Sequence, residues 1–127
     1  RTYCLTLPLV REDYPFGPDV HVFKIKEKLF AIMTTRQGIE RVNLKCDPEE
    51  AIILREIFDD VIPGYHMNKM HWNTIILSGS IPDGEIKRMI DRSYCLVVRK
   101  LKKRDRESLE VKYSHKKVFR SNTSPWV

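Results

Sequence analysis

Three short segments of alternating polarity, joined by tight links, constrain this chain more than any other feature. They cover residues 21–26 (HVFKIK), 29–35 (LFAIMTT) and 41–46 (RVNLKC). A period of two residues indicates strands with one buried side. The links at Glu27–Lys28 and Gly38 are short enough to join antiparallel neighbours. The sequence therefore predicts a three-stranded antiparallel meander over residues 21–46.

The segment that follows the meander carries a helix pattern. Residues 48–58 begin with Asp47 at the expected N-cap, Pro48 in the first helical position and Glu50 three residues after the cap, an arrangement typical of a capping box. The apolar positions recur with helical spacing and predict a buried face formed by Ala51, Leu54 and Phe58, with Ile53 and Ile57 beside it.

A second helix is predicted over residues 82–101. Ser80 is the expected N-cap, and Pro82 lies in the first turn. The expected core positions keep helical spacing and are Ile86, Ile90, Tyr94, Val97 and Leu101. This helix and the one before it supply the two strongest amphipathic patterns of the chain.

The remaining segments complete an α+β fold. Residues 1–9 resemble the end of a short helix stopped by Pro8, and residues 11–20 are rich in proline and predict a loop. Residues 61–77 predict two extended segments on either side of Asn68–Lys69. Helices and bunched antiparallel strands in this order predict a two-layer sandwich, with a sheet of about five strands and the helices on one face.

The basic charge is unevenly distributed. The 127 residues suit one compact domain and carry a net charge of +6. Residues 1–98 hold 13 Lys and Arg against 14 Asp and Glu, whereas residues 99–127 hold 10 against 3. We therefore expect a domain over residues 1–101 and a basic extension over residues 102–127, which is either disordered or contains a short strand at 109–113. A polyanion would be attracted mainly by this extension.

Cysteine usage and hydropathy predict a cytoplasmic protein. The three cysteines, Cys4, Cys46 and Cys95, are far apart and form no CxxC pair. Buried free thiols in a reducing compartment are the expectation. No apolar run approaches the roughly 20 residues that a membrane span needs, so we expect no membrane partner.

The segment GYHMNKMHWNTIIL, residues 64–77, concentrates the residues that could carry chemistry. His66 and His71 are five apart, which sends them to opposite sides of extended backbone, and no carboxylate or cysteine completes a metal site. No nucleophile elbow or phosphate-binding glycine loop occurs. We therefore expect no catalytic residue, metal or cofactor. Ile75 and Leu77 should point to the core, Asn68 and Lys69 should lie at or near an exposed turn, and at least one of the two histidines should be partly buried with a hydrogen-bond partner.

A polar set around this segment is the candidate binding surface. Its members can bond phosphates and base edges or stack on bases. They are Arg41, Asn43, Lys45, Tyr65, Asn68, Lys69, Trp72 and Asn73. Lys45 and Lys69 are expected to be exposed. The alternative is that Trp72 belongs to the core, that the asparagines hold the turn and that the lysines are merely solvated.

Several phrases of the sequence together resemble the MmcQ/YjbR family. They are DYPFGPDVHVFKIKEKLFAIM, RVNLKCDPEEA, VIPGYHMNKMHWNTIIL and MIDRSYCLVV, in this order over about residues 1–101. The resemblance implies a small bacterial, cytoplasmic protein with a CyaY/frataxin-like α-β sandwich. It also implies DNA binding by a double wing, in which hairpins grip the duplex. The near-neutral body and the basic extension depart from what this activity and the family core would suggest.

These observations lead to one function and two alternatives. The expected function is a non-enzymatic binding module whose partner is nucleic acid, most simply duplex DNA. The first alternative is a protein-interaction or regulatory adaptor that uses the same polar hairpin. The second is a small-molecule pocket around His66, His71 and the YPFG segment (residues 14–17).

Overall fold

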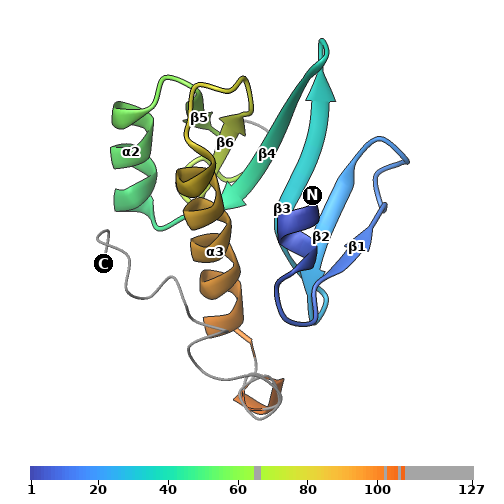
Figure 1. The fold of residues 1–127 in the computed structure, drawn as a ribbon. Coiled ribbons are helices and arrows are strands. Elements are labelled where there is room, and N and C mark those ends of the chain that lie inside the picture. Colours follow the sequence, from blue (N-terminus) through green and yellow to red (C-terminus); the bar gives the residue numbers. More distant parts are fainter. Residues whose placement is uncertain (65–66, 102, 106, 108–127) are drawn as a thin grey trace.

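A six-stranded antiparallel sheet with helices on one face forms the body of the protein (Figure 1). The computed structural model describes residues 1–64, 67–101, 103–105 and 107. In chain order the elements are α1 (Thr2–Leu5), β1 (Arg11–Asp13), β2 (His21–Ile25), β3 (Lys28–Arg36), β4 (Ile39–Lys45), α2 (Pro48–Ile57), β5 (Val61–Pro63), β6 (Trp72–Ile76) and α3 (Asp83–Arg99). The strand order β1-β2-β3-β4-β6-β5 confirms the predicted α+β sandwich, with one strand more than expected.

The predicted meander is present as β2, β3 and β4, but its first turn lies one residue earlier than expected. Lys26 and Glu27 occupy the turn with φ angles of 48° and 69°, and β3 begins at Lys28. The second turn has the same left-handed form at Gln37 and Gly38, with φ angles of 53° and 79°. Two consecutive residues with positive φ match the twist of antiparallel neighbours, which explains why both hairpins are so tight.

The prediction of a loop over residues 11–20 is wrong at its start, where β1 forms. This edge strand pairs antiparallel with β2. Its three residues are all charged, so no apolar alternation marks it. Ion pairs hold it instead: Arg11 contacts Glu27, and Lys24 Nζ lies 3.0 Å from Asp13.

Helix α2 is capped as predicted but buries a different set of residues. The Asp47 carboxylate accepts the backbone N–H of Glu49 at 3.0 Å, which satisfies a free donor of the first turn. Glu50 does not complete a capping box, because its side chain is buried and forms an ion pair with Arg92 of α3. Ala51 is buried as predicted, as is Leu54, whereas Ile52, Ile53 and Ile57 remain exposed.

Helix α3 lies across the sheet and closes the core. Pro82 rather than Ser80 is its N-cap, because the Ser80 hydroxyl donates to the Asp60 carboxylate instead. The predicted core positions Ile90, Tyr94, Val97 and Leu101 are buried, and Ile86 is partly buried. The Tyr94 ring meets Phe30 edge-on at 5.5 Å, and its hydroxyl donates to the Pro8 carbonyl at 2.8 Å. One side chain of α3 therefore ties the sheet to the start of the chain.

A bulge in the β2–β3 ladder explains a buried serine on α3. Lys24 pairs with Leu29 and Phe23 with Ala31, so Phe30 is an extra residue on β3. The Ser93 hydroxyl donates to the Phe30 carbonyl at 2.5 Å and accepts the backbone N–H of Lys45 at 2.9 Å. Ser93 thereby satisfies a backbone carbonyl at the bulge and a backbone N–H at the end of β4.

The predictions on cysteines are confirmed, and the described helices do not suggest a membrane span. Cys4, Cys46 and Cys95 are buried free thiols. Burial raises the pKa of Cys4 to about 11 and that of Cys46 to about 12, so both stay protonated and unreactive near neutral pH. Within the described ranges, no helix combines the length and apolarity needed to cross a bilayer. The possible strand at 109–113 lies outside the described residues.

Candidate nucleic-acid interface

The sheet face opposite the helices holds a concave polar surface. Strand alternation places Arg41 and Asn43 on this outer face, since Val42 and Leu44 between and beside them are buried in the core. Cross-strand pairing brings Thr34 beside Arg41 and Thr74 beside Asn43. The concavity is lined by Thr34, Thr35, Arg36, Arg41, Asn43, Ile62 and Thr74. We call the five residues Thr34, Arg36, Arg41, Asn43 and Thr74 the outer-face patch.

The two arginines of the outer-face patch carry uncompensated charge. Arg36 is exposed and Arg41 is half-buried. Among the residues that the structure describes, neither forms an ion pair, and the buried Arg41 Nε has no hydrogen-bond partner. A buried donor without a protein partner is uncommon, and a water molecule or an anion could accept a hydrogen bond from it. Asn43 accepts the Thr74 hydroxyl through Oδ1, which leaves its NH₂ group as the donor for a ligand.

Two other cations of the same face, Arg11 and Lys24, are paired with carboxylates. Arg11 on β1 pairs with Glu27, and Lys24 on β2 pairs with Asp13. Exposed pairs of this kind contribute little to stability, but they reduce the positive potential around β1 and β2. The attraction for an anion is therefore concentrated on β3 and β4, at the outer-face patch.

Lys45 lies at the end of β4 and is half-buried, so the expectation of an exposed lysine is wrong. Burial lowers the pKa of Lys45, and the nearby positive charges of Lys100 and Lys28 lower it further. The three lysines form a basic cluster where β4 ends and α3 terminates. Like charges held this close favour a bound anion, because an anion would relieve their mutual repulsion.

Two residues predicted for the surface are buried in the structure. Trp72 is only 8% exposed, and it packs so closely under Gly64 that a Cβ there would lie 2.9 Å from its own Cβ. Asn73 is 1% exposed and donates to the Ala51 carbonyl at 3.2 Å, which fastens β6 to α2. Trp72 is therefore a core residue, and neither side chain is available to stack on or bond to a base.

The connection between β5 and β6 retains part of the predicted polar surface. Asn68 and Lys69 are exposed as expected, and the Asn68 side chain accepts the Met70 backbone N–H at 2.9 Å. Ile75 is buried as predicted and Leu77 packs against the core. His71 is half-buried, and its side-chain partner stays a prediction. Tyr65 and His66 lie outside the described residues.

A buried polar cluster lies on the opposite, helix-covered side of the sheet. Arg92 contacts Glu50 inside a small cavity of about 20 Å³ that is also lined by Asn73. Burial raises the pKa of Glu50, against the lowering influence of Arg92. The cavity has room for about one water molecule, and the Asn73 Oδ1 atom, buried without a partner, would accept from it. This arrangement is suited to joining α2 to α3 rather than to binding an external ligand.

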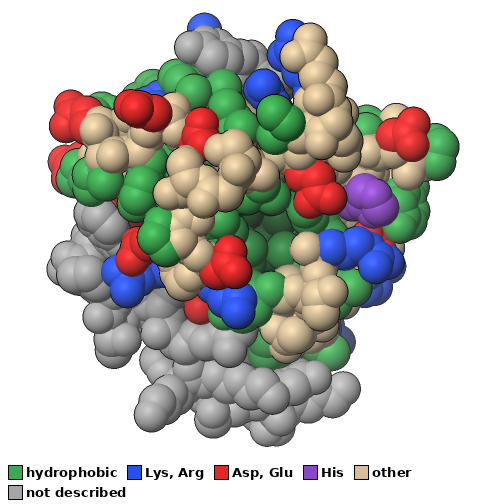
Figure 2. All heavy atoms as spheres, turned by 45° about the horizontal axis from the view of Figure 1, so that its top comes forward, with side chains coloured by type: hydrophobic (Ala, Val, Ile, Leu, Met, Phe, Trp, Pro, Cys, Tyr) green, Lys and Arg blue, Asp and Glu red, His purple; other side chains and the backbone are tan. Residues whose placement is uncertain are grey.

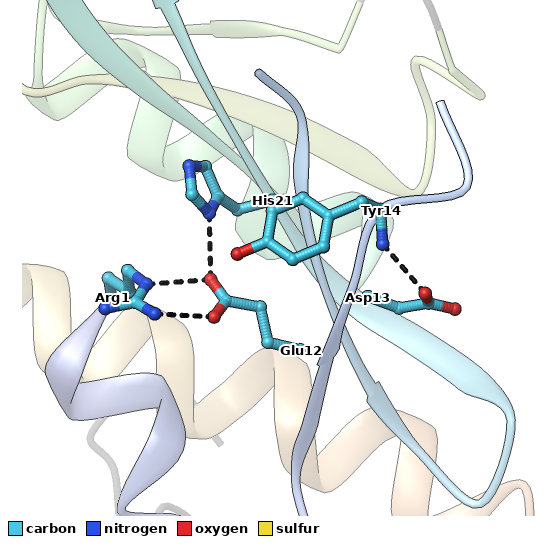
Figure 3. Close-up of polar contacts among 5 residues, drawn as sticks. All are labelled: Arg1, Glu12, Asp13, Tyr14 and His21. Carbon is cyan, nitrogen blue, oxygen red and sulfur yellow. Dashed lines mark hydrogen bonds and ion pairs between the residues drawn. The ribbon is translucent and has the colours of Figure 1, made fainter. Parts of the chain in front are cut away.

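Sequence reasoning missed a polar cluster beside α1 (Figure 3). Glu12 accepts two hydrogen bonds from Arg1, at 2.8 and 2.7 Å, and lies 2.8 Å from His21 Nδ1. The hydrogen bonds from Arg1, followed by that of His21, lower the pKa of Glu12 to about 2. The Tyr14 ring meets the His21 ring edge-on at 5.2 Å. Recognising β1 would have revealed this cluster, because the β1–β2 register places Glu12 opposite Phe23, and His21 is its diagonal neighbour on the same side of the sheet.

The cluster orients the His21 imidazole and joins the first helix to the β1–β2 hairpin. A carboxylate that holds one ring nitrogen fixes the tautomer of a histidine, as in acid–base catalysis, but the same contact also serves as a simple structural tie. Among the described residues, no group of three or more His, Cys, Asp or Glu side chains is arranged to hold a metal ion.

Comparison with known proteins places the chain in a family. The family model YjbR matches residues 5–96. YbdF of Escherichia coli O157:H7 is 39% identical over 103 residues, which cover 81% of this chain and 84% of YbdF. YjbR of Escherichia coli strain K12 is 35% identical over 107 residues, which cover 84% and 91% of the two chains. Both relatives are described as uncharacterized, so their similarity to this chain gives no information about its activity.

Solved structures support the same assignment. The crystal structure of the Deinococcus radiodurans protein DR2400 superposes with a TM-score of 0.80 at 36% identity, covering 86% of this chain and 83% of that one. A crystal structure of a Pseudomonas syringae protein gives a TM-score of 0.61 at 30% identity, covering 68% and 86%. With more than half of its length matched by the family model and with relatives above 30% identity, the chain belongs to the YjbR family.

Proposed function

We propose that this protein is a non-enzymatic DNA-binding module that holds the phosphate backbone on the outer face of its sheet. The observation that supports the proposal is the state of Arg41. Its side chain is half-buried, its Nε is unpaired, and it shares a concavity with the exposed Arg36. Two guanidinium groups over a hollow surface suit phosphate oxygens, because each can donate two parallel hydrogen bonds to one phosphate.

The polar side chains around the arginines extend the contact. The Asn43 NH₂ group and the hydroxyl of Thr34 can bond to phosphate or sugar oxygens next to an Arg-bound phosphate. Contacts of this kind position a protein on the duplex without reading its sequence. We therefore expect binding that tolerates many sequences, in agreement with the burial of Trp72 and Asn73.

The basic charge elsewhere would add long-range attraction. The cluster of Lys28, Lys45 and Lys100 lies at the end of the sheet, and residues 99–127 hold 10 Lys and Arg against 3 Asp and Glu. Each phosphate neutralised on duplex DNA contributes a salt slope of about −0.9. Because residues 1–98 are nearly neutral overall, the body would bind only at the patch, and the basic extension would account for much of the salt dependence.

A pair of matched double variants tests the outer-face patch. Arg36→Ala with Arg41→Ala removes two charges from the outer face, and Lys87→Ala with Arg88→Ala removes two from α3 on the other side. Each would be titrated against a fluorescent duplex of about 20 base pairs, with a single strand of the same sequence as a second probe. The outer-face variant should reduce the salt slope by about 2 and bind more weakly at every salt concentration. The α3 variant should bind almost as the unaltered protein does.

A control separates lost binding from lost folding. Arg41 is half-buried, so its removal could lower the melting temperature, whereas Arg36 is exposed. Arg36→Ala alone should therefore keep the melting temperature and lower the affinity for the duplex. Equal affinities for the outer-face and α3 variants would refute the patch.

A third variant tests the predicted hairpin surface. Lys45→Ala with Lys69→Ala removes the two lysines expected to contact phosphates. If this pair leaves the affinity unchanged while the arginine pair abolishes it, the β5–β6 connection has no part in DNA binding.

A further inference from the structure

Helix α2 exposes an apolar surface that the proposed DNA contact does not use. Ile52, Ile53 and Ile57 are 51%, 41% and 53% exposed. Their spacing of one, four and five residues places them side by side on the solvent face of one helix. Single exposed isoleucines are ordinary, but three adjacent ones on a helix are typical of an interaction surface.

The fully exposed charges beside these isoleucines are negative. Glu49 and Glu56 share the exposed face of the helix, and Asp47 and Asp59 are exposed at its two ends. Figure 2 shows hydrophobic and acidic side chains gathered together on the side of the molecule where α2 lies. We define the α2 face as Glu49, Ile52, Ile53, Glu56 and Ile57. Its partner must be apolar and basic.

A second copy of the chain does not meet this requirement. Two α2 faces packed together would bring Glu49 and Glu56 of each chain against the same carboxylates of the other. Like charges at an interface oppose association unless cations separate them. Arg55 is the one cation of the helix, and it lies half-buried at the edge of this face, three residues after Ile52.

The end of the chain has the required chemistry. Residues 109–120 read LEVKYSHKKVFR and combine five apolar or aromatic residues with four Lys and Arg and one Glu. Helices α2 and α3 cover the same face of the sheet, and α3 ends beyond the lower end of α2 (Figure 1). Helix α2 has 10 residues and is therefore about 15 Å long, while an extended segment spans about 3.3 Å per residue. The segment is long enough to reach the whole face.

We propose that residues 109–120 dock on the α2 face, with their apolar side chains against the isoleucines and their basic side chains beside Glu49 and Glu56. This inference does not depend on DNA binding. It also gives the basic extension two competing partners, since a segment held on α2 has its lysines near carboxylates and is less available to phosphates. Docking would therefore limit non-specific attraction to polyanions until a strong site releases the segment.

A spin label on the full-length chain tests the contact directly. Ser114→Cys introduces one thiol into the segment, and the native Cys4, Cys46 and Cys95 are buried and so resist labelling. The label should broaden the amide NMR signals of Ile52, Ile53 and Ile57. A mixture of labelled chains and isotope-enriched unlabelled chains should show no such broadening. Broadening in the mixture would mean that a second copy supplies the contact and would overturn the proposal.

Matched substitutions identify the surface. Ile53→Glu and Ile39→Glu replace isoleucines of nearly equal exposure, 41% and 43%, on α2 and at the β3–β4 turn. In the unaltered chain, amide hydrogens of residues 109–120 should exchange at least about tenfold more slowly than an unstructured chain would. Ile53→Glu should abolish this protection, and Ile39→Glu should preserve it. Absence of protection in the unaltered chain, or protection that survives Ile53→Glu, would refute the docking.

A charge exchange tests the complementarity. Glu49→Lys with Glu56→Lys should remove both the broadening and the exchange protection. Adding Lys116→Glu with Lys117→Glu to that variant should restore them. Failure of the second pair to restore the contact would show that the charges do not select the segment.

Discussion

Helices α2 and α3 cover the same face of one sheet, yet they relate to it in opposite ways. Helix α3 has seven buried residues between Met89 and Val98 and lies across the middle of the sheet. Helix α2 buries Glu50, Ala51 and Leu54 and leaves its isoleucines in solvent. The difference shows that α3 builds the core, whereas α2 is fastened to the body by a few contacts and presents a surface. The predictions below test this division of roles.

The largest effect should come from the aromatic centre of α3. Tyr94→Ala removes a side chain that is 1% exposed, with its edge contact to Phe30 and its hydrogen bond to Pro8. We expect a loss of about 3–5 kcal/mol in the free energy of unfolding, measured by urea denaturation. Tyr94→Phe keeps the ring and should cost about 1–3 kcal/mol, because it leaves the buried Pro8 carbonyl without a donor. A loss below about 1 kcal/mol for Tyr94→Ala would mean that α3 does not hold the core.

The next effect concerns the bond between the two helices. Arg92→Met leaves the Glu50 carboxylate buried without its partner and should cost about 3 kcal/mol near neutral pH. Adding Glu50→Gln should recover much of this loss, because no buried charge then remains. If Arg92→Met alone were neutral, the ion pair would have no part in attaching α2 to α3.

The pH dependence of this pair has a definite sign. Burial raises the pKa of Glu50 in the folded protein, so the folded state binds more protons than the unfolded state above the ordinary carboxyl pKa. The contribution of Glu50 to stability is therefore largest at low pH and is lost as pH rises through the raised pKa. Removing Arg92 should extend this loss to higher pH, and Glu50→Gln should abolish it. Urea denaturation at pH values from about 4 to about 8, where a carboxyl group with a raised pKa titrates, measures how each substitution changes the pH dependence of the free energy of unfolding.

How much of this could be predicted from sequence depends on what each residue contacts. Both helices and the meander follow from local spacing, and those predictions are confirmed, as is the Asp47 cap; the Ser80 cap and the Glu50 capping box are wrong. Strand β1 has no apolar residue, so only its pairing with β2 reveals it. In α2 the apolar residues occupy more than one side, and the sequence alone does not say which side meets the sheet. The structure assigns Ala51 and Leu54 to the core.

The candidate site was predictable only in part for a similar reason. Arg41 and Asn43 alternate with buried neighbours on β4, and that pattern places them on the outer face correctly. Strand β6 is buried on both sides, so alternation gave no indication that Trp72 and Asn73 are inaccessible. Arg36 was missed because it closes a strand beside a turn, where charged residues are common. Arg36 and Arg41 line the same concavity only because β3 and β4 pair in the folded sheet.

A moderate effect is expected at the start of α2. Asp47→Ala removes the side-chain acceptor for the Glu49 backbone N–H and should cost about 1 kcal/mol, measured as a change in the urea midpoint. Asp47→Asn keeps an acceptor and should cost less. Helix α3 has no side-chain cap at Pro82 and is held by its buried residues instead. Helix α2 has fewer buried residues, so we expect its side-chain cap to contribute more to its stability. If Asp47→Ala left the free energy of unfolding unchanged, the side-chain cap would not distinguish α2 from α3.

The smallest effect should come from the α2 face itself, and it gives the sharpest comparison between the helices. Ile57→Ala on α2 and Ile90→Ala on α3 make the same chemical change at 53% and 6% exposure. The first should lower the free energy of unfolding by no more than about 1 kcal/mol, because exposed side chains lose little on truncation. The second should lower it by about 2–5 kcal/mol, because it leaves a cavity in the core. Urea denaturation of both variants measures the two losses in the free energy of unfolding. If Ile57→Ala cost as much as Ile90→Ala, the α2 face would be covered by a partner strongly coupled to folding, and α2 would belong to the core as fully as α3 does.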